Sequence, residues 1–165
     1  MVTLNDLFRG MEDILSKLKQ KYTAIESVND LAMLTDTESE REALSEQLSV
    51  PYYQIYYVSK LANILQCADL SLEDAEFLVK TGIRSINDLK KINTDQYVAF
   101  LQNNGYTMKS RAVDAAVVNA WIFSAMNVSS DFEEDAANLA NASYLYSLSK
   151  SNRRSMINAR TPSTS

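Results

Sequence analysis

Histidine is absent from this chain of 165 residues, and cysteine occurs only once, as Cys67. The absence of imidazole removes the side chain best suited to acid–base catalysis near neutral pH and the commonest metal ligand in proteins. Hydrolases that use a Ser-His-Asp or Cys-His arrangement are excluded by this inventory alone. The sequence therefore predicts a protein that is not an enzyme and that has no catalytic residues, no metal site and no cofactor.

We expect no segment for secretion or membrane insertion in this sequence. A single cysteine cannot form an internal disulfide, and no N-terminal apolar run resembles a signal peptide, so we expect a cytoplasmic protein. The most apolar segment, residues 112–128, is interrupted by Asp114, Asn119 and Ser124. It falls short of the roughly 18 uncharged residues of a membrane span, so it predicts a buried core helix and no membrane association.

Glycine and proline, the residues that mark turns, number three and two. A fold of many short strands needs more turn residues, so the composition favours an all-α protein with long helices. Hydrophobic residues make up 46% of the chain, which is enough for a buried interior. The length fits one domain or two small subdomains with a shared core.

Helix-start signals recur along the chain. Each is a Ser or Thr followed three residues later by an acid, which can cap the first turn and complement the positive end of the helix dipole. The pairs are Thr3–Asp6, Ser27–Asp30, Thr37–Glu40, Ser71–Asp74, Ser85–Asp88 and Ser130–Glu133. Apolar periodicity then predicts helices over residues 3–22, 28–34, 38–48, 52–67, 72–81, 86–92, 95–104, 108–127 and 131–149.

One phrase occurs twice in the chain. Residues 25–31 read IESVNDL and residues 83–89 read IRSINDL. In both copies, a short Ser-capped helix leads to an amphipathic helix and then to a longer helix, and such a unit cannot bury its apolar face alone. We interpret the phrase as the sign of an internal duplication in which two helical units form one core. A chance match is the alternative.

The segment from Leu61 to Leu89, LANILQCADLSLEDAEFLVKTGIRSINDL, resembles a helix-hairpin-helix unit. The residues that carry the resemblance are Ala75, Leu78, Gly82, Ile83, Ser85, Ile86 and Leu89. The wider pattern over residues 24–104 resembles a bacterial domain of unknown function built from paired helix-hairpin-helix elements. This resemblance implies a compact helical bundle of two related helix-hairpin-helix-like units, and it also implies nucleic-acid binding.

The hairpin departs from the family pattern. Where the family has Pro-Gly-apolar-Gly, this chain has Ala68, Asp69, Leu70 and Ser71. The family's glycines let backbone amides approach a phosphate closely, whereas Asp69 places a negative charge where the phosphate would lie. Nucleic-acid binding is therefore the alternative prediction and not the leading one.

Charge divides the chain unevenly. Residues 1–135 carry 12 Lys and Arg against 21 Asp and Glu, so their net charge is 12 − 21 = −9, while residues 136–165 contain no acid. The basic residues of that second part are Lys150, Arg153, Arg154 and Arg160. This tail has three interpretations: weak contact with nucleic acid, docking on an acidic neighbour such as another copy of the chain, or a free tail without a partner.

Four tyrosines gather at the start of the predicted helix over residues 52–67, namely Tyr52, Tyr53, Tyr56 and Tyr57. Their spacing places at least two of them at the edge of the core. Exposed tyrosines are frequent in protein interfaces and can also stack on bases. We weigh a protein interface and packing at the core edge equally, and base stacking less.

Small residues within 112–120 and 136–142 indicate helices that approach a partner closely, either each other or a neighbouring subunit.

The predicted organisation is an N-terminal amphipathic helix (1–23), a paired core (24–128), a C-terminal helix (129–150) and a flexible basic tail (151–165). We expect a non-catalytic helical adaptor or structural subunit of a larger assembly. Its partner is another protein or a second copy, and no small-molecule substrate is expected.

Overall fold

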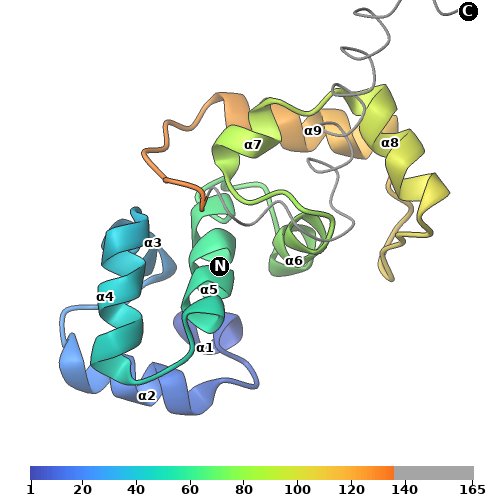
Figure 1. Ribbon diagram of the computed structural model, residues 1–165. Helices are drawn as coiled ribbons and strands as arrows, with labels where there is room; N and C mark the ends of the chain where they lie inside the picture. Colours follow the sequence, from blue (N-terminus) through green and yellow to red (C-terminus); the bar gives the residue numbers. More distant parts are fainter. Residues whose placement is uncertain (136–165) are drawn as a thin grey trace, which may run out of the picture.

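Residues 1–135 are the part of the chain that the computed structural model describes, and every regular element in them is a helix (Figure 1). The helices are α1 (Leu4–Leu7), α2 (Glu12–Lys21), α3 (Val28–Leu34), α4 (Glu38–Leu48), α5 (Tyr52–Ile64), α6 (Leu72–Lys80), α7 (Ile86–Lys90), α8 (Thr94–Asn103) and α9 (Ala115–Met126). They pack on one another around a continuous apolar core, which confirms the predicted all-α class. None of these helices has the length and apolar character needed to cross a bilayer.

Hydroxyl–acid pairs begin most of the helices, as predicted. At α3 the Ser27 hydroxyl accepts from the Asp30 amide at 3.1 Å, and the Asp30 carboxylate accepts from the Ser27 amide at 3.1 Å. The same reciprocal pair of bonds caps α1, α4 and α6. Each pair satisfies two amides that a helix start leaves without a partner, so these boundaries follow from local sequence.

The single N-terminal helix predicted over residues 3–22 is wrong, because the structure divides it into α1 and α2. Gly10 adopts a left-handed conformation with a φ of 82°, and the Met11 amide donates to the Phe8 carbonyl at 2.7 Å. Glycine enters this conformation without a steric penalty. Apolar residues are buried on both sides of this turn, Leu7 and Phe8 before it and Ile14 and Leu15 after it, so the apolar period does not reveal the break.

The helix predicted over residues 108–127 starts seven residues late, at Ala115. The Asp114 carboxylate accepts from the Val117 amide at 3.0 Å and caps the true start. The residues before it form an irregular loop in which Arg111 is ion-paired with Asp74 at 2.7 Å. The cap at Asp114 therefore begins the helix seven residues later than the apolar period predicts.

The last predicted helix, over residues 131–149, is wrong for residues 131–135, which have no helical structure. The Ser130 hydroxyl does not cap a helix there, because it accepts from the Phe132 amide at 3.2 Å and from the Asn63 side chain at 2.8 Å. The rest of that helix and the basic tail lie outside the described residues.

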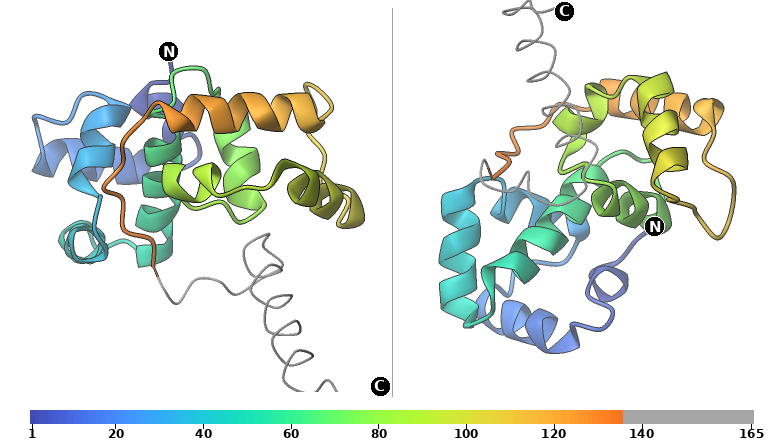
Figure 2. Two further views of the ribbon diagram at one scale, coloured as in Figure 1. Left: turned by 90° about the horizontal axis from the view of Figure 1, so that it is seen from above. Right: turned by 45° about the vertical axis from the view of Figure 1, so that its right-hand side comes forward.

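The two copies of the repeated phrase occupy corresponding places. Helices α3 and α4 both pack on α5, and helices α7 and α8 both pack on α9 (Figure 2). Leu31 of the first copy and Leu89 of the second copy are each 0% exposed. Helices α3, α4 and α5 form the first helix triplet, and helices α7, α8 and α9 form the second. Helix α6 packs on α5 and follows it in the chain, so it connects the two triplets. The two triplets therefore share one packing pattern, as an internal duplication predicts, and the duplication itself stays a prediction.

Candidate interaction surfaces

Residues 128–135, which we call the strap, leave the end of α9 and cross to the first helix triplet (Figure 1). At one end of the strap, the Lys90 ammonium donates to the Val128 carbonyl at 2.6 Å. Near the other end, the Glu133 amide donates to the Asp36 carbonyl at 2.7 Å. The strap therefore connects the second repeat to the first through bonds that are remote in sequence.

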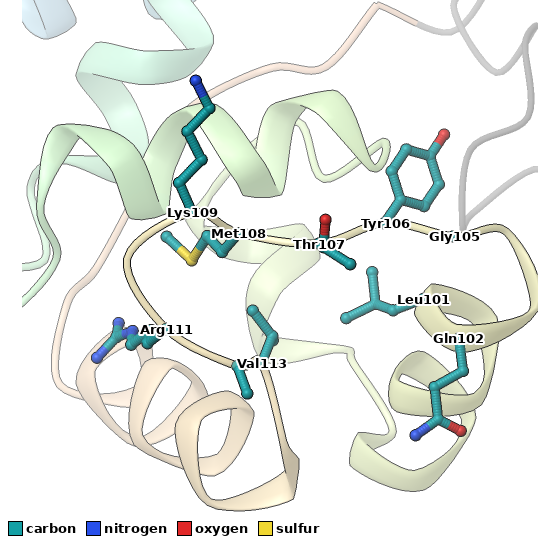
Figure 3. A pocket seen from close by; sticks show the side chains of 10 residues that line it. Leu101, Gln102, Gly105, Tyr106, Thr107, Met108, Lys109, Arg111 and Val113 are labelled. Atoms are coloured by element: carbon teal, nitrogen blue, oxygen red, sulfur yellow. The ribbon is translucent and has the colours of Figure 1, made fainter.

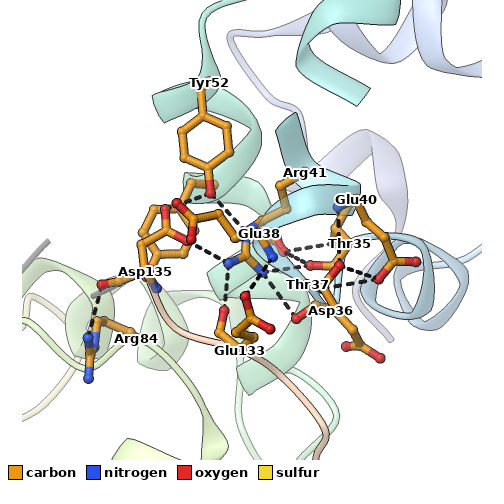
Figure 4. Close-up of polar contacts among 12 residues, drawn as sticks. Thr35, Asp36, Thr37, Glu38, Glu40, Arg41, Tyr52, Arg84, Glu133 and Asp135 are labelled. Carbon is orange, nitrogen blue, oxygen red and sulfur yellow. Dashed lines mark hydrogen bonds and ion pairs between the residues drawn. The ribbon is translucent and has the colours of Figure 1, made fainter. Parts of the chain in front are cut away.

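A buried ion pair fixes the strap. The Arg41 guanidinium, whose side chain is 0% exposed, lies 2.7 Å from the Asp135 carboxylate (Figure 4). The other oxygen of this carboxylate accepts from the Tyr52 hydroxyl at 2.5 Å. Arg41 also donates to the backbone carbonyls of Thr35 and Glu133, at 2.9 and 2.5 Å. Burial and the hydrogen bond to Asp135 together raise the pKa of Tyr52 above its ordinary value.

Aromatic rings close over the same ion pair. Phe132 of the strap stacks on Tyr56 with the ring planes 5° apart and the centroids at 6.4 Å. Arg41 lies over both rings, at 4.9 Å from the Tyr56 centroid and 4.7 Å from the Phe132 centroid. The Asp135 amide donates to the Tyr56 hydroxyl at 3.1 Å. These contacts surround a buried charge with hydrogen bonds and ring faces, which offset part of its desolvation.

The tyrosine cluster divides into two pairs. Tyr52 is half-buried and Tyr56 is buried, and both hold the strap. Tyr53 is 69% exposed and Tyr57 is half-buried. The expectation that at least two tyrosines lie at the edge of the core agrees with this placement. A shared protein interface for all four residues stays a prediction, and Tyr53 and Tyr57 are the members available to it.

The degenerate hairpin lies in the turns between α5 and α6. Ala68, Asp69 and Ser71 are exposed, and Leu70 is buried. The amide of Ser71 donates to the Asp74 carboxylate at 3.0 Å, and the Asp74 amide donates to the Ser71 hydroxyl at 3.1 Å. Side-chain oxygens of Ser71 and Asp74 thus already accept from two amides at the start of α6.

A half-open cavity of about 520 Å³ lies between the end of α8 and the loop that leads to α9 (Figure 3). Two basic side chains, Lys109 and Arg111, contribute to its lining. Arg111 already pairs with Asp74 and lies over the Trp121 ring at 5.7 Å. In the part of the chain that the structure describes, no three Cys, Asp or Glu side chains are grouped as metal ligands would be.

The outer face of α9 is exposed and uncharged. Phe123 is 73% exposed and Met126 is 63% exposed. The other exposed positions of the helix are Ala115, Ala116, Asn119 and Ala120, and the sequence from Ala115 to Met126 contains no charged residue. The opposite face packs into the core through the buried residues Val118, Trp121 and Ala125. Helix α9 thus presents an apolar face without a partner among residues 1–135.

The positions of the predicted tail contacts, Lys150, Arg153, Arg154 and Arg160, lie outside the described residues. Sequence reasoning did not find the Arg41–Asp135 pair or the exposed face of α9. The alanines of α9 did indicate a closely approaching partner, but the sequence left open whether that partner is in the same chain.

The class defined by these features is an all-helical protein with two related helix triplets joined by a strap. The chain belongs to the family described as Domain of unknown function (DUF4332), whose model matches residues 10–128. The match includes every helix from α2 to α9 and is therefore wider than the resemblance over residues 24–104. The comparisons with curated proteins and with solved structures found no match.

Proposed function

We propose that this protein is a non-catalytic helical adaptor or structural subunit that acts through protein–protein contacts in a larger assembly. The observation that carries the proposal is the outer face of α9, where Phe123 and Met126 are 73% and 63% exposed. Aromatic and methionine side chains are enriched in protein interfaces, whereas charged residues are depleted from interface centres. A helix face that combines both properties is suited to burial against another protein.

The small side chains on the same face support close packing. Ala116 and Ala120 are one turn apart and are both exposed, so a partner helix can approach the α9 backbone there. Phe123 lies a further turn along and offers a large apolar group to a partner's pocket. Residues 1–135 carry a net charge of −9, so a second copy of the chain is repelled by most of this surface. The electrostatic repulsion is weakest at an uncharged face.

The helix-hairpin-helix interpretation is part of this proposal. Helices α5 and α6 pack on each other across a short run of turns, as the two helices of such an element do. Because Asp69 is an exposed acid in the hairpin and the amides of Ser71 and Asp74 are already paired, we assign the element a structural role. Nucleic-acid binding is the alternative that the resemblance implies. It predicts duplex binding in a gel shift at about 50 mM salt that is lost on deletion of residues 150–165, and absence of a shift contradicts it.

A cytoplasmic location also belongs to the proposal. Cys67 is buried and free, and burial raises the pKa of its thiol above the ordinary value. A buried thiol of this kind is an inert core residue, which fits a reducing compartment without requiring a redox role.

The experiment compares Phe123→Asp with Met33→Asp, because Met33 of α3 is 65% exposed and provides a matched apolar position away from α9. Both variants should keep the thermal unfolding midpoint of the wild type, since neither side chain is buried. Light scattering should show that the wild type and Met33→Asp form an oligomer, or an affinity pull-down should show that both retain the same partner. Phe123→Asp should lose the oligomer or the retained partner. A strictly monomeric wild type without a retained partner contradicts the proposal, as does a partner retained equally by Phe123→Asp.

A further inference from the structure

A second surface, separate from α9, contains a cavity of about 430 Å³ on one side of α5. It is lined by Met11, Tyr53, Gln54, Tyr56, Tyr57 and Lys60. Tyr53, Tyr56 or Tyr57, and Lys60 follow the i, i+3 or i+4, i+7 spacing that places side chains on one helix face. Met11 comes from the turn between α1 and α2. The volume lies in the range of small-ligand pockets.

Lys60 is the only charged residue in the lining of this cavity. Its ammonium is half-buried and lies 4.4 Å from the centroid of the Tyr56 ring. Among residues 1–135 it forms no ion pair, although the Asp135 carboxylate, which is bonded to Arg41 and Tyr52, acts on its charge from a distance. Burial lowers the pKa of the Lys60 ammonium below its ordinary value. A partly desolvated cation that has a ring face but no ion-pair partner of its own can recognise an anionic group.

The walls define the rest of the ligand. Three tyrosine rings and a methionine provide apolar contact, and the hydroxyls of Tyr53 and Tyr57 have no hydrogen-bond partner among the described residues. These hydroxyls can donate to an anionic oxygen. A single lysine suits a monoanion, whereas a phosphate dianion is usually held by arginine forks or by several donors. The lining therefore fits a carboxylate attached to an apolar group.

We propose that the cavity beside α5 binds a carboxylate carried by an apolar body, with Lys60 as its counter-ion and the Tyr53, Tyr56 and Tyr57 rings as its walls. The C-terminus of a peptide with an apolar last residue and a free alkanoate share this chemistry. The proposal concerns a different helix from α9, so it stands or fails independently of the adaptor function.

Isothermal titration of the full chain tests it with three probes: the peptide acetyl-Ala-Ala-Phe with a free carboxylate, the same peptide with a C-terminal amide, and octanoate. We expect the peptide acid to bind about tenfold or more tightly than the amide, because a charge-assisted hydrogen bond is lost in the amide. Lys60→Gln should abolish this preference. Lys91→Gln is the matched control, since Lys91 is exposed and absent from the lining, and it should leave the preference unchanged.

Tyr53→Ala provides a second variant that is not expected to affect folding, because Tyr53 is 69% exposed. It should weaken both the acid and the amide, and the acid at least as much as the amide, since it removes a wall together with a hydroxyl that can donate to the carboxylate. Octanoate binding that depends on Lys60 supports the proposal and assigns the site to free acids, while binding of the peptide acid alone supports it and assigns the site to protein C-termini. Equal affinity for acid and amide overturns the proposal. So does the absence of saturable binding of both acids up to millimolar concentration.

Discussion

Removal of the Asp135 carboxylate tests whether the strap is a fixed part of the fold. Asp135→Ala takes away the acceptor for both Arg41 and the Tyr52 hydroxyl, at 2.7 and 2.5 Å. Arg41 is 0% exposed, so its charge stays buried without a counter-ion. Breaking a buried pair in this way destabilises by about 3–5 kcal/mol. Because Arg41 keeps its bonds to backbone carbonyls such as that of Thr35, we expect the lower end, about 3 kcal/mol.

Urea unfolding followed by circular dichroism measures this loss. Arg9→Ala is the control, because the Arg9–Asp6 pair is a surface ion pair with an Arg9 side chain that is 80% exposed. Exposed pairs contribute about 0–1 kcal/mol, so this variant should unfold close to the wild type. The double variant Arg41→Met with Asp135→Ala should lose less stability than the sum of its single variants, because no unpaired charge remains. A change below about 0.5 kcal/mol for Asp135→Ala would refute the assigned role of the pair.

Three further predictions concern the repeats, the hairpin and one helix cap. Leu31→Ala and Leu89→Ala should each destabilise by about 2–5 kcal/mol in urea unfolding, since both leucines are 0% exposed, and a value near zero for one of them contradicts the duplication. Asp69→Gly should leave the thermal midpoint nearly unchanged because Asp69 is exposed, and a large decrease would contradict the exposed position of the hairpin. Hydrogen bonds from the Glu26 amide and from Ser27 lower the pKa of Asp30, so its contribution to stability is present above the ordinary Asp pKa and is lost as pH falls through the lowered value. Asp30→Asn should therefore reduce the acid-induced loss of stability below about pH 4 in urea unfolding, and an unchanged pH profile contradicts the cap.

Much of the fold could be predicted from local sequence, since helix starts depend on side chains three residues apart. The boundaries of α3 and α4 agree with the predicted 28–34 and 38–48 for this reason. Gly10 was not recognised as a break, because the apolar period continues on both sides of its turn. The late start of α9 coincides with the Asp114 cap, and the loop before it contains the Arg111–Asp74 pair, whose two members are 37 positions apart.

The strap was beyond sequence reasoning because Arg41 and Asp135 are separated by 94 positions. One signal was available, however. Arg41 precedes the buried residues Leu44 and Leu48 by three and seven positions, so it occupies the apolar face of α4. A basic residue at such a position predicts a buried acidic partner, although the pattern does not say which acid.

The tyrosine cluster shows a similar limit. Spacing alone placed at least two of Tyr52, Tyr53, Tyr56 and Tyr57 at the edge of the core, but it did not separate the pair that holds the strap from the pair that remains available. That separation depends on the position of Phe132 and Asp135, which arrive from the other end of the chain.

Site-specific photo-crosslinking in the host cell tests the central claim, contact between α9 and another protein, most directly. A benzophenone amino acid replaces Phe123 in one variant and Met33 in the other, since the two positions are 73% and 65% exposed. We expect irradiation to give a discrete adduct of higher mass, with a second copy or another protein, at position 123 and not at position 33. No adduct at position 123, or the same adducts at both positions, contradicts the assignment of α9 as the interaction face.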